Sequence, residues 1–115
     1  DASLADNDGA QPVDQPVVPH GPAAYFSTLP VKKMAAALQE GGIPAFLSYS
    51  AGTYVCNHLL YTLLHFIHTE APSIQGGFIH VPYLPEQAAG KTPPPPSMEL
   101  SQIVRGLELA IQALV

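Results

Sequence analysis

The prolines of this chain limit where regular secondary structure can form. Thirteen of the 115 residues are proline; five fall within residues 1–30, and four are consecutive at residues 93–96. A proline ring fixes φ and removes a backbone donor, so helix interiors and central strands exclude it. We therefore expect an irregular loop region over residues 1–30. We also expect a linker that runs through Pro82, Pro85 and residues 93–96, where the four prolines should adopt extended polyproline II.

The segments between these regions predict helices and strands in alternation. The expected order is a helix at Val31–Glu40, a strand at residues 43–49, a helix at residues 54–68, a strand at residues 76–82 and a last helix with Ser97 as its N-cap. Strands joined by crossover helices should be parallel. Because two strands are too few for a stable parallel sheet, we expect an α/β chain that forms part of a larger domain.

The single cysteine, Cys56, follows a turn at Gly52 and opens the long apolar segment of residues 54–68. A strand that turns into a helix at this point would leave Cys56 in the first helical turn. Unpaired N–H groups and the helix dipole favour a thiolate there. The alternative is that Cys56 is simply a small buried apolar residue.

A histidine near the end of the second predicted strand favours the reactive interpretation of Cys56. His80 lies in an apolar segment that is bounded by Gly76 and Pro82. In open α/β sheets the ligand crevice lies at the carboxyl ends of the strands, so the Gly52 turn and His80 could meet there. A cysteine with a later histidine is typical of a thiolate and imidazolium pair, in which His80 would take the thiol proton.

Composition argues against several classes of partner. The formal net charge is −5 and only four residues are basic, which argues against nucleic acid or an anionic membrane as a partner. One cysteine cannot form an internal disulfide and fits a reducing cytoplasm. No apolar run reaches the ~18 residues of a membrane span.

The histidines of the second predicted helix do not predict a metal site. His65 and His68 are one turn apart, but His58 is seven residues from His65. This spacing clusters at most two of the four ligands that a structural zinc site needs. We expect no metal and no cofactor.

Four ordered blocks of the sequence resemble pyroglutamyl peptidase I, also called pyrrolidone-carboxylate peptidase, a family of cytoplasmic cysteine exopeptidases. The blocks are residues 6–12 (DNDGAQP), 21–30 (GPAAYFSTLP), 48–57 (SYSAGTYVCN) and 77–87 (GFIHVPYLPEQ). The family's cysteine signature runs through Cys56, and its histidine segment through His80. Family members are much longer, and this chain corresponds to roughly their C-terminal half.

The resemblance implies hydrolysis of an N-terminal pyroglutamyl residue from a peptide, with Cys56 as nucleophile and His80 as base. It also implies that Val55 and Leu4 contact the lactam ring, and the alternative is that either residue is an ordinary part of the core. The implied fold is a three-layer αβα sandwich with a central mixed, mainly parallel sheet, of which residues 1–115 supply the C-terminal part. A homotetramer and a cytoplasmic location are implied as well.

Two differences from the family pattern bear on catalysis. The glutamate that orients the histidine in the family lies upstream of the position that matches Asp1. Ser3 stands where relatives commonly carry an arginine, whose guanidinium could help to hold a thiolate or an oxyanion. A catalytically impaired homologue or fragment with a role in assembly or packing is therefore the alternative. A thiol redox sensor is disfavoured, since no resolving cysteine is present.

Overall fold

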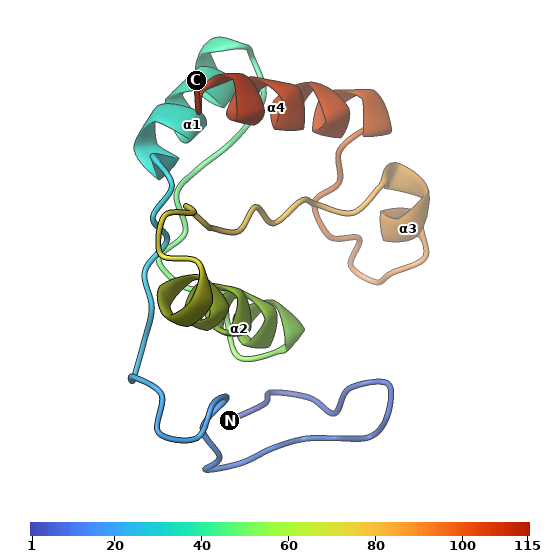
Figure 1. The fold of residues 1–115 in the computed structure, drawn as a ribbon. Coiled ribbons are helices and arrows are strands. Elements are labelled where there is room, and N and C mark those ends of the chain that lie inside the picture. Colours follow the sequence, from blue (N-terminus) through green and yellow to red (C-terminus); the bar gives the residue numbers. More distant parts are fainter. The chain divides into compact units, whose positions relative to one another are not determined.

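The computed structural model describes residues 1–115 and contains four helices joined by long irregular segments (Figure 1). The helices are α1 (Val31–Glu40), α2 (Val55–Glu70), α3 (Pro85–Ala89) and α4 (Leu100–Gln112). The chain divides into two compact units: the first comprises Asp1–Leu29 with Ser48–Phe78, and the second comprises Pro30–Leu47 with Ile79–Val115. Helix α2 belongs to the first unit, and the other three helices belong to the second.

The first unit is built around one face of α2. Leu64 and Ile67 are three residues apart on that face and are buried. Gly76 packs directly on them, since a Cβ at this position would lie 2.5 Å from Ile67 Cδ1. The backbone N–H of Thr28 donates to the Gly76 oxygen at 3.0 Å, and the Gly76 N–H donates to Thr28 Oγ1 at 2.9 Å. These two hydrogen bonds hold Thr28 against Gly76.

The second unit is held together by α1 packed against α4, which lie side by side in Figure 1. Its buried apolar residues are Met34, Ile43, Ala88, Ala110 and Ala113. Gly106 in the middle of α4 packs against this core, because a Cβ there would lie 3.2 Å from Ile43 Cγ2 and 3.5 Å from Leu38 Cδ2 of α1. The face of α4 that meets α1 and Ile43 therefore contains the small residues Gly106 and Ala110.

Three of the predicted helices are present, but the agreement between their predicted and observed ends differs. Helix α1 has the predicted bounds Val31–Glu40, and α2 starts one residue and ends two residues later than predicted. The prediction of Ser97 as an N-cap is wrong. Ser97 instead forms an isolated parallel bridge with Tyr83, so α4 begins only at Leu100, after the N-cap Glu99.

The short helix α3 lies in the part of the chain that we expected to be a linker. Pro85 occupies its first turn, and the Leu84 N–H donates to Gln87 Oε1 at 2.9 Å. A proline is well tolerated at the start of a helix, because the missing N–H would have no intrahelical partner there. The prolines of residues 82–85 therefore mark a helix start.

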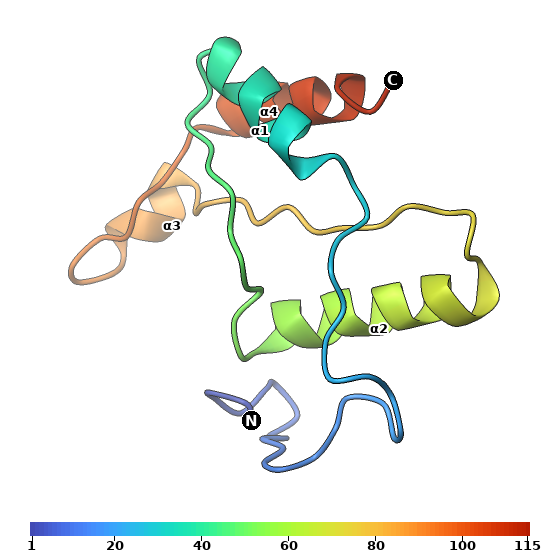
Figure 2. The same ribbon diagram turned by 90° about the vertical axis from the view of Figure 1, so that its left-hand side faces the viewer.

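The two predicted strands, residues 43–49 and 76–82, are not formed as strands in this chain. Both run as coil, and the isolated Tyr83–Ser97 bridge is the single β pairing (Figure 2). An apolar extended segment becomes a strand only when a neighbour satisfies its N–H and C=O groups. None of the four helices is long and apolar enough to cross a membrane.

Candidate active site

Cys56 is the second residue of α2, as the sequence predicts. The preceding loop turns at Gly52, whose φ of +81° is the left-handed conformation that favours glycine. Tyr54 is then extended at the N-cap, and α2 begins at Val55. No side chain caps this end of α2, and its first turn contains no acidic residue. Cys56, which is half-buried, thus lies where the helix dipole stabilises negative charge.

The N-terminal segment is held beside the start of α2. The Ser3 N–H donates to the Thr53 oxygen at 2.9 Å, and the Tyr54 hydroxyl donates to the Ala5 oxygen at 3.0 Å. These two hydrogen bonds flank Leu4 in the sequence and fix its backbone next to the residues that lead into the helix. The structure therefore brings the two predicted ring contacts, Leu4 and Val55, to the neighbourhood of Cys56.

Leu4 and Val55 present apolar surface that this chain does not cover. Leu4 is 64% exposed and Val55 is 53% exposed. An exposed leucine or valine alone is ordinary on a protein surface. Here both residues belong to the segments that meet at the start of α2, where the single cysteine also lies.

Asp6 is engaged in the structure of the adjoining loop. Its Oδ1 accepts the N–H of Asp8 at 2.9 Å and the N–H of Ala10 at 2.8 Å. This is the turn-forming role that aspartate takes in loops. Asp6 thus shapes the turn of residues 6–10, which follows Leu4 in the sequence.

His80 lies in the second unit and is exposed. It lines a pocket of about 250 Å³ together with Val81, Pro82, Tyr83 and Gln87. Lys91 Nζ lies 5.0 Å from the centroid of the Tyr83 ring, a cation–π distance. Of the four predicted site residues, Leu4, Val55 and Cys56 therefore belong to the first unit, and His80 belongs to the second.

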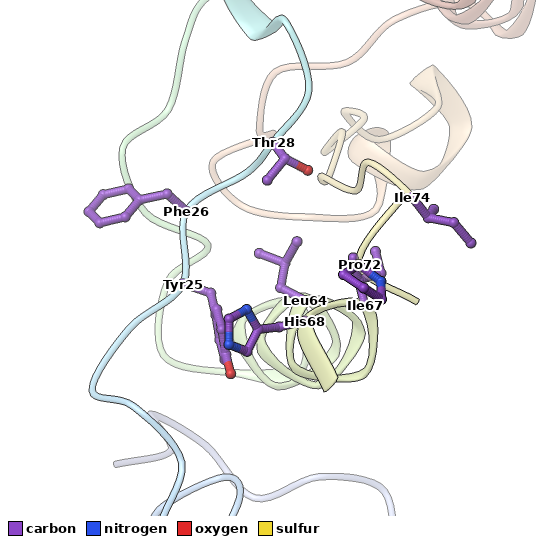
Figure 3. Close-up of a pocket in the computed structure, with 8 residues that line it drawn as sticks. All are labelled: Tyr25, Phe26, Thr28, Leu64, Ile67, His68, Pro72 and Ile74. Carbon is purple, nitrogen blue, oxygen red and sulfur yellow. The ribbon is translucent and has the colours of Figure 1, made fainter. Parts of the chain in front are cut away.

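Another pocket, of about 140 Å³, lies on the first unit near the far end of α2. Figure 3 shows its lining residues: Tyr25, Phe26, Thr28, Leu64, Ile67, His68, Pro72 and Ile74. Leu64 is eight residues beyond Cys56, a distance of about 12 Å along a helix axis. This pocket is therefore separate from the cysteine.

Beside this pocket, Tyr25 joins the N-terminal loop to α2. Its hydroxyl lies 2.8 Å from His65 Nδ1, and its ring meets the Tyr61 ring edge-on with centroids 5.0 Å apart. Burial raises the pKa of Tyr25 above its ordinary value of 10.0, and the nearby Tyr61 adds to the rise. Sequence analysis missed this contact, although Tyr61 and His65 stand four residues apart on one helix face.

Tyr25 and Phe26 are neighbours in the first loop but lie in two different environments. Tyr25 is packed against α2, whereas Phe26 is 87% exposed and its side chain extends away from α2 in Figure 3. The structure contains no group of three or more His, Cys, Asp or Glu side chains arranged to hold a metal ion.

Comparison with known proteins identifies the family. The family model for pyroglutamyl peptidase (peptidase C15) matches residues 1–115. The pyrrolidone-carboxylate peptidase of Bacillus cereus strain G9842 is 58% identical over 112 residues, which are 97% of this chain and 52% of that protein. The Bacillus anthracis protein of the same name is 57% identical with the same coverage.

Solved structures agree with this match. The crystal structure of pyroglutamyl peptidase I from Bacillus amyloliquefaciens has a TM-score of 0.92 and 45% identity, and the match covers 99% of this chain and 53% of that one. A mutant pyrrolidone carboxyl peptidase from the hyperthermophile Pyrococcus furiosus has a TM-score of 0.92 and 44% identity, covering 99% and 56%. The chain thus spans about half the length of the relatives it matches. Residues 1–115 belong to the pyroglutamyl peptidase family.

Proposed function

We propose that residues 1–115 are the C-terminal part of an enzyme that removes an N-terminal pyroglutamyl residue from peptides. The observation that carries the proposal is the position of Cys56, the single cysteine, in the first turn of α2 within a chain that belongs to the family along its whole length. A thiol at a helix N-terminus is activated by backbone N–H groups and by the helix dipole.

In the proposed reaction, Cys56 is the nucleophile and His80 is the general base and acid. His80 takes the thiol proton as the sulfur attacks the pyroglutamyl carbonyl carbon. It then gives that proton to the leaving amine as the C–N bond breaks, which leaves a thioester on Cys56. Water, deprotonated by His80, attacks the thioester carbon, and the S–C bond breaks to release pyroglutamate and the thiol.

The start of α2 would also stabilise the tetrahedral intermediates. Backbone N–H groups in the first turn of a helix are directed toward negative charge, and they are fixed before the reaction begins. The Gly52 turn and the extended Tyr54 lead the chain into this end of α2, which no side chain caps. The same turn would therefore activate the thiol and bind the oxyanion.

Leu4 and Val55 are proposed to contact the lactam ring. Both are more than half exposed, and the hydrogen bonds from Ser3 and Tyr54 fix the backbone around Leu4. A five-membered lactam offers an apolar ring face that such side chains can cover. This contact would favour pyroglutamate over an extended, charged N-terminal residue.

The proposed enzyme has an α/β fold, a three-layer αβα sandwich with a central mixed, mainly parallel sheet, and works in the cytoplasm as a homotetramer. In this proposal residues 43–49 and 76–82 pair with strands of the remaining part of the domain. That part would also supply the glutamate that orients His80. Several large apolar side chains support this view, since Phe26, Phe46 and Tyr49 are each more than four-fifths exposed in residues 1–115.

Turnover of a pyroglutamyl chromogenic amide by the intact protein tests the proposal. We expect release of the chromogen, no release from the matching prolyl or glutaminyl amide, and inactivation by iodoacetamide in step with labelling of Cys56. Ser3 motivates the alternative of an impaired homologue, because relatives commonly carry arginine there. A folded intact protein that cleaves none of the three amides would support that alternative and contradict ours.

A further inference from the structure

The pocket that His80 lines can be assigned a role in the proposed reaction, in addition to the role of His80 itself. We propose that the pocket formed by His80, Val81, Pro82, Tyr83 and Gln87 receives the side chain of the first residue of the leaving peptide. This inference rests on the proposed function, because it assumes that His80 protonates the leaving amine.

The geometry of proton transfer assigns the pocket to the leaving side of the substrate. A general acid must come within about 3 Å of the atom that it protonates, and here that atom is the nitrogen of the leaving residue. The Cα of that residue is bonded directly to this nitrogen, so its side chain starts beside the imidazole of His80. A pocket that includes His80 in its wall is therefore the nearest space for that side chain.

The size and lining of the pocket fit a single amino-acid side chain. Its volume of about 250 Å³ is below the roughly 300–1,000 Å³ of sites for drug-sized ligands. Val81, Pro82 and the Tyr83 ring provide apolar walls, and no carboxylate or ammonium group is among the lining residues. The ammonium of Lys91 lies outside the lining, against the Tyr83 ring at 5.0 Å from its centroid. The pocket should therefore favour uncharged apolar or aromatic residues after pyroglutamate, with the Tyr83 ring as a partner for an aromatic side chain.

Gln87 is the residue through which this preference can be changed. Its Oε1 accepts the Leu84 N–H at 2.9 Å, which fixes the side chain at the start of α3. A glutamate at this position can accept the same bond, as glutamate does at the third position of many helices. Gln87→Glu thus adds a negative charge to the pocket while retaining the contact that positions the side chain.

The experiment compares leaving residues in the intact enzyme. Four peptides of equal length carry Leu, Phe, Glu or Lys after pyroglutamate, and each kcat/KM is divided by that for a pyroglutamyl chromogenic amide, which has no leaving amino acid. In the wild type we expect Leu and Phe to be preferred over Glu and Lys. In Gln87→Glu the Lys-to-Glu ratio should rise about tenfold, as expected for one charge a few ångströms away in a partly exposed site.

Two further variants serve as a control for charge and as an independent test of the pocket. Ala89→Glu adds the same charge to α3 at an exposed position that does not line the pocket, and it should leave the Lys-to-Glu ratio at the wild-type value. Tyr83→Ala should lower the Phe-to-Leu ratio severalfold, and it tests the pocket independently if Gln87→Glu does not fold.

The outcomes separate this inference from the function on which it rests. An unchanged Lys-to-Glu ratio in folded Gln87→Glu would overturn the pocket assignment, and so would an equal rise of that ratio in Ala89→Glu. In both cases, turnover of the chromogenic amide would still support the proposed peptidase activity. Equal loss for Phe and Leu peptides in Tyr83→Ala would also overturn it. Absence of turnover on the chromogenic amide by the wild type would overturn both.

Discussion

The hydrogen bonds between Thr28 and Gly76 allow a sharp prediction about what holds the first unit together. Gly76 is buried, and its N–H donates to Thr28 Oγ1 at 2.9 Å. Thr28→Val replaces this hydroxyl with a methyl group of nearly the same size. The Gly76 oxygen loses the long 3.4 Å bond from the Thr28 hydroxyl but keeps its donors from the Thr28 backbone and from Ser27 Oγ. The main effect of the substitution is therefore that one buried N–H, that of Gly76, loses its acceptor.

The expected cost follows from that single orphaned donor. A buried N–H that loses its acceptor costs about 1–3 kcal/mol, which corresponds to a factor of about 5–150 in an equilibrium constant. We therefore expect the Gly76 amide of Thr28→Val to exchange its hydrogen with solvent about 5- to 150-fold faster than in the wild type. Hydrogen exchange of the intact protein, read at Gly76, measures this directly.

Two variants show whether the hydroxyl is responsible. Thr28→Ser keeps the acceptor and should retain most of the protection at Gly76. Thr62→Val makes the same chemical change at an exposed position of α2 and should leave exchange at Gly76 unchanged. The reasoning is refuted if Gly76 exchanges at the wild-type rate in folded Thr28→Val.

Three other predictions concern the site, the loop contact and the chain. Ser3→Arg should raise kcat/KM on a pyroglutamyl amide about tenfold. The Ser3 backbone is hydrogen-bonded to Thr53 just before α2, and a guanidinium there can stabilise the thiolate or oxyanion. An equal rise in Ser3→Gln would contradict this charge effect. Because the pKa of Tyr25 is raised by folding, the unfolded chain loses that proton first, so stability falls as pH rises above about 10. Urea midpoints should then fall less steeply with pH in Tyr25→Phe than in the wild type, and parallel slopes would disprove the link. Residues 1–115 expressed alone should self-associate through their exposed apolar side chains, whereas a monomer that melts cooperatively in sedimentation and calorimetry would contradict the proposed division of the domain.

The helices could be predicted because their signals are local. Helix α1 follows Pro30 and ends at Gly41 and Gly42, and the structure gives it the predicted bounds. The position of Cys56 in the first turn of α2 was predictable for the same reason, since a glycine turn followed by a long apolar segment indicates a helix start. Helix α3 was missed because Pro85 was interpreted as part of a linker, although Gln87 three residues after Leu84 is a helix-start signal.

The parts that could not be predicted depend on residues far apart in the sequence. The contact between Tyr25 and His65 joins residues 40 positions apart, and no local pattern specifies such a pair. The same limit applies to residues 43–49 and 76–82, whose apolar pattern predicts an extended chain but does not identify a pairing partner. Leu4 was placed at the site only through the family resemblance, because a single apolar residue in a loop carries no signal of its own.

The effect of Cys56→Ser on catalysis tests the central claim most directly. In the intact enzyme, kcat/KM for a pyroglutamyl chromogenic amide should fall by at least about a thousandfold, since the nucleophile is removed, while hydrogen exchange shows that α2 remains folded. A folded Cys56→Ser variant that keeps more than about a tenth of the wild-type kcat/KM would contradict the assignment of Cys56 as the nucleophile.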